Sequence, residues 1–275
     1  MNQTIKSTLA AALLAATMLS CKKNKTQEPQ LTINPAETAT AETGKVVQYN
    51  FAGSLTDVSG NNLSATSNNT VTFSTDRFSR PGQAALFDGI NSAAIIPSLF
   101  SQQINYPFAV SLWFKANQVD SLQTLFLADG MPGYINYTGF SLQIGGLGRS
   151  GSLAFSTGNN SCACPSARQT SYLTDMINPD TWYHVVVNVR EDGFDGRDIY
   201  LNGVKQSNPV PEGVSSIPAL LWLDPDQHST AAGTLGINYN PQYNYQKFGG
   251  LLDDIRIYKK LLTAGDVAAL YNWQP

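Results

Sequence analysis

A strand-like segment that runs directly into a short helix, at residues 246–271, constrains the fold of this chain most strongly. The segment reads QKFGGLLDDIRIYKKLLTAGDVAALY, and Leu251 and Ile257 are two of the apolar side chains that the strand would bury. Two adjacent carboxylates, Asp253 and Asp254, interrupt the apolar pattern. A carboxylate that faces the interior of a sandwich must be bound or hydrogen-bonded, because an unpaired charge is costly to bury.

Two local signals indicate where a helix and a hairpin form. Thr263 lies three residues before Asp266, which is the spacing of a capping box at a helix start. Upstream, residues 181–206 predict a long strand, a Gly/Asp turn, and then a hairpin that turns at Asn202-Gly203. An Asn-Gly pair between strand-like runs is the strongest short-range signal for a hairpin. These segments therefore predict antiparallel strands.

These two units together resemble the laminin-G/pentraxin-like family. The closing strand of that family is matched by FGGLLDDIRIYKKLLT, from Phe248 through Thr263. Three more segments resemble its opening strand and turn, its next hairpin and its central Trp-bearing strand: residues 49–62, 85–97 and 107–116. The resemblance spans residues 45–273 and implies an all-β, concanavalin A-like jelly-roll sandwich of two antiparallel sheets with a short C-terminal helix. It implies no particular ligand, because this fold carries many unrelated activities.

Residues 1–20 are expected to be a bacterial lipoprotein signal peptide. A single lysine precedes an apolar run from Leu9 to Leu19, and Ser20-Cys21 closes the segment. A small residue before a cysteine resembles the lipobox, in which the Cys21 side chain is acylated and becomes the new N-terminus. Each buried CH₂ of an acyl chain contributes about 0.8 kcal/mol to anchoring. The alternative is an ordinary secretory signal in which Cys21 has no such role.

Residues 21–44 are interpreted as a flexible tether, and residues 45–275 as one LamG-like domain. The tether holds Lys, Glu, Thr, Pro and Ala with almost no apolar content, and such a composition cannot build a core. Three lysines directly follow Cys21, whereas surface-exported lipoproteins of the Bacteroidota usually carry acidic residues there. The expected location is therefore the cell envelope, with the outer membrane favoured and the periplasmic or surface face left open.

Length and charge narrow the classes of function. The chain has 275 residues, a net charge of −3 at pH 7 and no basic cluster, so a nucleic-acid partner is not expected. About 230 residues follow the tether, which is enough for one β domain with a full core. Short alternating segments separated by turn-forming residues are typical of a sandwich.

The acidic residues argue against an enzyme. Glycoside hydrolases need two well-placed carboxylates, and glucanases on this fold typically use a Glu-x-Asp-x-x-Glu strand, which this chain lacks. After the tether only Glu191 and Glu212 remain as glutamates, each in a predicted turn. His184 is expected to be a strand residue of the sandwich, and His228 lies in an Asp-rich loop without a nucleophile motif. Catalysis is therefore not predicted.

A structural calcium ion is the cofactor that the sequence allows. Calcium prefers carboxylate, amide and main-chain oxygens, and the turn that contains Asp57 and Asn61 is rich in such groups. In the family this turn can lie near the last strand, where Asp253 and Asp254 occur. Only one of that pair can face a given site on an ideal strand, and Asp253 is taken as the ligand. Asp88 is a third oxygen donor. The alternative is that Asp57 forms an Asx turn, Asp253 caps backbone groups and Asp88 belongs to an ordinary hairpin turn.

The aromatic residues fall into two groups. Trp113 and Trp182 lie on long apolar strands and are predicted to be core residues. Others lie in loops among Asn and Gln and are the candidate ligand-binding residues: Tyr134, Tyr137, Trp222, Tyr239, Tyr243 and Tyr245. Sugar recognition combines flat apolar faces with amide or carboxylate partners for hydroxyls. The alternative is that these side chains only cover the edge of the sandwich.

Cys162 and Cys164 form a C-A-C sequence in a polar loop. Outside the cytoplasm they are able to pair, although one intervening residue makes the ring small and strained. A local disulfide is preferred over two free thiols. Zinc is not expected, because the two further ligands of a four-coordinate site are not apparent.

The sequence therefore predicts a membrane-anchored, non-catalytic, lectin-like module that binds a glycan. The alternative is a protein-binding or adhesion module of the cell envelope, which would use the same loops against a partner surface. A glycoside hydrolase is the least favoured of the three.

Overall fold

The computed structural model describes one β-rich unit of the chain. The described residues are 41–67, 70–97, 99, 104–128, 139–146, 148–158, 168–190, 196–207, 209–213, 232–238 and 246–274. All of them fall within one compact unit, Ile33–Pro275. In these ranges no helix combines the length and the apolar character needed to span a membrane.

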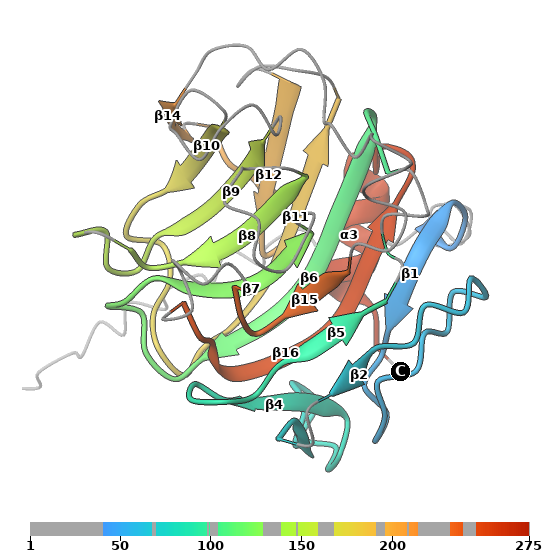
Figure 1. The fold of residues 1–275 in the computed structure, drawn as a ribbon. Helices are drawn as coiled ribbons and strands as arrows, with labels where there is room; N and C mark the ends of the chain where they lie inside the picture. Colours follow the sequence, from blue (N-terminus) through green and yellow to red (C-terminus); the bar gives the residue numbers. More distant parts are fainter. Residues whose placement is uncertain are drawn as a thin grey trace, which may run out of the picture. The chain divides into compact units, whose positions relative to one another are not determined.

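The described strands form two antiparallel sheets (Figure 1). Sheet A has the order β13-β12-β11-β6-β16-β4-β3, and β1 also pairs with β16. Its strands are β1 (Lys45–Tyr49), β3 (Thr72–Ser74), β4 (Ala84–Asp88), β6 (Phe108–Ala116), β11 (Trp182–Val189), β12 (Arg197–Leu201), β13 (Val204–Lys205) and β16 (Gly249–Tyr258).

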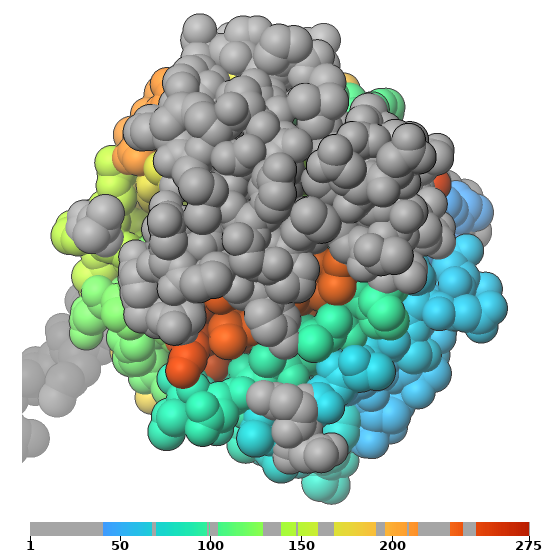
Figure 2. Space-filling view, viewed as in Figure 1, coloured from blue at the N-terminus to red at the C-terminus, as the bar shows by residue number. Residues whose placement is uncertain are grey.

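Sheet B has the order β14-β10-β9-β8-β7-β15-β5-β2. Its strands are β2 (Thr66–Ser67), β5 (Ala94–Ile96), β7 (Gln123–Ala128), β8 (Phe140–Ile144), β9 (Leu153–Gly158), β10 (Arg168–Leu173), β14 (Val210–Gly213) and β15 (Gly233–Leu235). Figure 2 shows teal-to-green residues directly beside orange-red ones at the surface, in agreement with the pairing of β15 with β5. The predicted all-β sandwich of two antiparallel sheets is confirmed.

The main core lies between the two sheets. Alternate residues of β6, such as Phe108 and Phe114, face the core because successive side chains of a strand point to opposite faces. The Phe108 ring meets two rings of sheet B, Phe140 at a centroid distance of 5.2 Å and Phe155 at 6.5 Å. Burying each phenyl ring contributes about 1.5–3 kcal/mol, before the cost in conformational entropy. Aromatic contacts between the sheets therefore hold the sandwich together.

A second, smaller apolar cluster lies on the outer face of sheet A. The C-terminal helix α3 (Ala264–Asn272) packs there through Val267 and Leu270. The predicted capping box is confirmed, since Thr263 Oγ1 accepts from the Asp266 N–H at 3.0 Å and the Asp266 carboxylate accepts from the Thr263 N–H at 2.9 Å. The cap fixes where the helix begins, directly after β16.

The predicted Asn-Gly turn is also confirmed. Asn202 and Gly203 both have positive φ, at 51° and 79°, which a type I′ hairpin turn requires. Gly203 has a second constraint, because an added Cβ would come within 3.1 Å of the Tyr271 side chain in α3. The turn therefore brings the β12–β13 hairpin against the C-terminal helix.

The two predicted core tryptophans have different outcomes. The prediction for Trp113 is confirmed: it is buried, on the face of sheet A that α3 covers, and stacks on Tyr271 with ring centroids 5.6 Å apart. The prediction that Trp182 is a core residue is wrong: it is only half-buried, at the first position of β11, with the Lys115 ammonium 5.9 Å from its ring. The alternation places Tyr183, the next residue, in the core instead.

Candidate functional site

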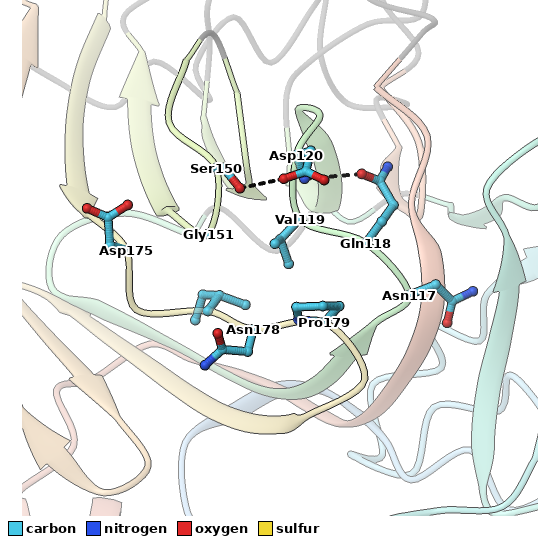
Figure 3. A pocket seen from close by; sticks show the side chains of 10 residues that line it. Asn117, Gln118, Val119, Asp120, Ser150, Gly151, Asp175, Asn178 and Pro179 are labelled. Carbon is cyan, nitrogen blue, oxygen red and sulfur yellow. Dashed lines mark hydrogen bonds between the residues drawn. The ribbon is translucent and has the colours of Figure 1, made fainter.

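A pocket lies where three loops meet. The loops follow β6 (residues 117–122), β8 (residues 145–152) and β10 (residues 174–181). The pocket has a volume of about 560 Å³ and is called here the loop pocket; Figure 3 shows the side chains that line it. Its lining residues are Asn117, Gln118, Val119, Asp120, Ser150, Gly151, Asp175, Ile177, Asn178 and Pro179.

Backbone hydrogen bonds tie the three loops together. The Gly151 N–H donates to Val119 O at 3.1 Å, and the Ile177 N–H donates to Gly151 O at 2.8 Å. Gly151 has a φ of 66°, and an added Cβ would lie 2.8 Å from Ile177 O. The close approach therefore requires glycine at this position. Since each loop is held by its neighbour, the lining side chains project from a defined frame.

The lining combines an apolar floor with polar groups on the rim. Val119 and Ile177 are buried, whereas Asn117, Asp175 and Asn178 are exposed. On another part of the rim, Asp120 Oδ1 accepts from the Ser150 hydroxyl at 2.6 Å, and Gln118 Oε1 accepts from the Asp120 N–H at 3.1 Å (Figure 3). Amide and carboxylate groups around an apolar surface are suited to a ligand that carries both hydroxyl and C–H groups.

The sequence analysis did not find the loop pocket. Its polar residues lie in three turns between strands, where Asn, Asp, Ser and Gly are common for local conformational reasons. Each turn viewed separately is therefore ordinary. The signal lies in the pairing of the strands, which brings the three turns to one end of the sandwich.

Asp57 and Asn61, two residues of the expected calcium site, form hydrogen bonds within their own turn and with β1. Asp57 Oδ1 accepts from the backbone N–H groups of Gln48 and Ser59, at 3.0 and 2.9 Å. Asp57 Oδ2 accepts from the Leu63 N–H at 3.0 Å. Burial would raise the pKa of Asp57, but hydrogen bonds from three backbone N–H groups and the Ser59 hydroxyl lower it overall. Asn61 Nδ2 donates to the Val46 carbonyl at 2.9 Å.

Asp253 belongs to a different set of contacts. Its carboxylate accepts from Arg77 Nη1 and from the Asp254 N–H, the latter at 2.8 Å. Asp57 and Asp253 therefore have no hydrogen-bond partner in common. Across the ranges given above, no three His, Cys, Asp or Glu side chains are grouped as a metal site would need. Calcium binding through Asp57, Asn61 and Asp253 stays a prediction.

Asp88, the third oxygen donor named from the sequence, accepts from the backbone N–H groups of its own turn, at 2.8 Å each.

The expectation that only one carboxylate of the Asp253-Asp254 pair can face a given site is wrong. The register between β16 and β6 shifts between Asp253 and Arg256, so β16 contains a bulge, and Asp254 has a φ of 44°. A bulge breaks the strict alternation of side chains. Both carboxylates consequently reach the same guanidinium, with Arg77 Nη2 at 2.6 Å from Asp254 Oδ2.

Arg77, Asp253, Asp254 and Arg256 form a buried charged group, called here the Arg77 cluster. Each of these side chains is at most 5% exposed. Arg256 Nη2 lies 3.6 Å from Asp254 Oδ1, and the Arg77 guanidinium lies 4.5 Å from the centroid of the Trp113 ring. Burial and the Asp254 carboxylate raise the pKa of Asp253 to about 8, while Arg77 acts in the opposite direction. This arrangement neutralises the carboxylates and locks Arg77 to β16.

His184 is buried beside this cluster, so the prediction that it is a strand residue of the sandwich is confirmed. Its ring stacks on Trp113 at 5.0 Å between centroids, and its Nε2 lies 3.0 Å from the Ser111 hydroxyl. Burial, followed by the positive charges of Arg256 and Arg77, lowers the pKa of His184 to about 3. The ring is therefore neutral at physiological pH and has a structural role.

Several residues named from the sequence lie outside the described part of the chain. These are Cys21, Tyr134, Tyr137, Cys162, Cys164, Glu191, Trp222, His228, Tyr239, Tyr243 and Tyr245. The prediction that Glu212 lies in a turn is wrong: it lies in β14, which pairs with β10, and its carboxylate pairs with Arg149 at 3.0 Å and with Arg168 at 3.3 Å.

Comparison with known proteins agrees with this architecture. The Laminin_G_3 model, described as the concanavalin A-like lectin/glucanases superfamily, matches residues 88–268. The adhesion G-protein coupled receptor V1 of Danio rerio is 27% identical over 176 residues, which cover 64% of this chain but only 2% of the receptor.

Two solved structures illustrate the likeness in fold. Domain 4 of AbnA, a GH43 extracellular arabinanase from Geobacillus stearothermophilus, has a TM-score of 0.58 and 21% identity, over 83% of this chain and 98% of that domain. The binding domain of botulinum neurotoxin DC has a TM-score of 0.58 and 17% identity, over 84% of this chain and 52% of the neurotoxin chain. The family match covers more than half of the sequence, and the chain belongs to the concanavalin A-like lectin/glucanases superfamily.

Proposed function

We propose that this protein is a membrane-anchored, non-catalytic module that binds carbohydrate, and that the loop pocket is part of its glycan site. The observation that supports this most directly is the composition of the pocket. Amide, carboxylate and hydroxyl groups surround the buried side chains of Val119 and Ile177. A pyranose ring offers hydroxyl groups around its rim and C–H groups on its faces, so this lining is complementary to it.

The known proteins with the same fold are consistent with a binding role. The arabinanase domain was solved in complex with arabinotriose, and the neurotoxin binding domain with a sialylated ligand named SialylT. Another structure of the neurotoxin domain is a complex with rat synaptotagmin II, which is a protein. A protein partner is therefore the alternative outcome of the experiment below.

The positions of the acidic side chains support binding rather than hydrolysis. Asp253 and Asp254 are buried against Arg77, so they are not presented to a substrate. Glu212 is paired with two arginines on β14. In the loop pocket, Asp120 is held by Ser150 on the rim. A glycosidase needs a free acid and a free base or nucleophile that face each other across the scissile bond.

The lipid anchor is a separate part of the proposal and rests on the sequence of residues 1–21. Changing Cys21 to Ala should give a soluble or unprocessed protein, because acylation of this thiol would be lost. The measurement is partition between detergent and aqueous phases, together with the N-terminal mass. Normal maturation and unchanged detergent partition of the Cys21→Ala protein would exclude the anchor.

The glycan proposal is tested with two variants of the pocket. Asn117→Ala and Asn178→Ala should each weaken binding by about 0.5–1.5 kcal/mol, which is the usual net contribution of one hydrogen bond. A glycan array would first identify an oligosaccharide retained by the full-length protein in detergent. Calorimetry with that oligosaccharide would then compare the variants with Asn50→Ala, which changes an exposed asparagine directly after β1 and outside the pocket lining.

Three results would contradict this proposal. If no glycan is retained, the module binds something else, and a protein partner becomes the favoured reading. If the glycan is cleaved, the protein is an enzyme. If binding survives both pocket variants unchanged, the glycan site lies elsewhere, and the tyrosines of residues 239–245 are the next to change.

A further inference from the structure

We infer that the loop pocket selects glycans without acidic groups and rejects those that carry carboxylate or sulfate groups. This inference rests on the proposed function and narrows its ligand class. It follows from the charges at the rim of the pocket and from the way in which the neighbouring cations are already engaged.

Among the residues that the structure describes, the charged side chains that line the pocket are all acidic. Asp120 and Asp175 contribute carboxylates from two different loops, and Figure 3 shows them at separate parts of the rim. Asp180, one residue beyond the lining residue Pro179, is also exposed. No Lys, Arg or His occurs among the ten residues that line the pocket. A ligand carboxylate in the pocket would therefore meet only like charge.

The cations nearest in the sequence have other partners. Arg149 precedes Ser150, but its guanidinium lies 3.0 Å from the Glu212 carboxylate and 4.1 Å from the centroid of the Tyr172 ring. Lys115 precedes the pocket loop on β6, and its ammonium lies over Trp182. Both positive charges therefore already have partners on strands, Arg149 with Glu212 and Tyr172 and Lys115 with Trp182. An acidic sugar would have to displace them to gain an ion pair.

The rim groups can still serve a neutral sugar. A carboxylate accepts hydrogen bonds from hydroxyl groups more strongly than a neutral oxygen does. Asp120 also accepts from the Ser150 hydroxyl, which fixes its orientation. No hydrogen bond or ion pair from another described residue engages the Asp175 side chain, which is exposed. Both are thus suited to accept from sugar hydroxyls or from the ammonium of an amino sugar.

The test uses matched pairs of oligosaccharides, each neutral core being presented with and without an added carboxylate or sulfate. At low salt the neutral member of a pair should bind about fivefold more tightly or better, as expected for like charges about 8 Å apart at a partly exposed site. The preference should shrink in about 0.5 M salt, because the screening length then becomes shorter than this distance. The full-length protein is used throughout.

Charge-removing variants make the test specific to the pocket. Asp120→Asn and Asp175→Asn together should bring the neutral-to-acidic ratio close to one, and neutral glycans should bind more weakly because their hydroxyl groups lose charged acceptors. Glu42→Gln removes one negative charge at an exposed position and should leave the ratio unchanged. Equal binding of neutral and acidic members, or a ratio unaffected by the double variant, overturns this inference while the glycan function stands. Absence of binding to every member overturns the proposed function itself.

Discussion

Replacing Arg77 with Ala should lower the free energy of unfolding by about 3–5 kcal/mol, because the change leaves the buried Asp253 and Asp254 carboxyl groups without the guanidinium that bonds to both. Asp253 and Asp254 have side-chain exposures of only 3% and 5%, and Arg77 contacts both. Arg256 is 3.6 Å from Asp254 and cannot replace the paired contact with Asp253. Denaturant titration at pH 7 measures the loss, and a lower midpoint at an unchanged slope would show that the variant is less stable.

Two further variants distinguish the loss of the buried Arg77 contact from the loss of a positive charge. Arg77→Lys keeps the positive charge but loses the fork that bonds two carboxylates, so it should be intermediate. Lys205→Ala removes an ion pair whose lysine is 55% exposed, and Asp198 keeps Arg190 as a partner. Such a pair contributes about 1 kcal/mol or less. A loss for Arg77→Ala no greater than that for Lys205→Ala would show that the Arg77 cluster does not hold the fold.

The second large effect is a loss of stability in acid that originates from His184. Its pKa falls from 6.5 to about 3 on folding. Between these two pH values the unfolded chain binds a proton that the folded protein does not, so stability decreases as the pH falls. Each pH unit within this window corresponds to about 1.4 kcal/mol. The stability that neutral His184 contributes is fully present above pH 6.5 and is lost as the pH falls toward 3.

This contribution is measured as a difference between two proteins. Asp253 acts in the opposite direction, because its raised pKa makes stability decrease as the pH rises from its ordinary value toward about 8. Both the native protein and His184→Gln carry Asp253, so comparison of the two largely removes its effect. Between pH 6.5 and 4.5, the native protein should lose about 2–3 kcal/mol more than His184→Gln does. Parallel stability curves would show that His184 does not stay neutral in the folded state.

The features that could be predicted from sequence are those fixed by neighbouring residues. The Asn202-Gly203 turn needs two residues that tolerate positive φ, and both are adjacent. The cap of α3 involves Thr263 and Asp266, three positions apart. The strand alternation that fills the core is likewise local. These signals suffice to identify the sandwich and its terminal helix.

The features that could not be predicted depend on contacts between distant segments. Asp253 and its partner Arg77 are separated by 176 positions, so nothing near the aspartates identifies the arginine. The bulge that turns both carboxylates the same way arises from the pairing of β16 with β6. Trp182 lies in an apolar run like that of Trp113, and only its place at the start of β11 leaves it half-exposed. The loop pocket forms only where three loops that are separate in the sequence meet, so no one of these loops predicts it.

The position of β16 in sheet A has a consequence for the order in which the chain can fold. This strand pairs with β6 on one side and with β4 and then β1 on the other, as Figure 1 shows. It is also the last strand of the sequence. The two halves of sheet A therefore stay unjoined until the C-terminal strand has been made, and the closure joins Lys45 to Tyr258 across nearly the whole domain. Such long-range closure is slow.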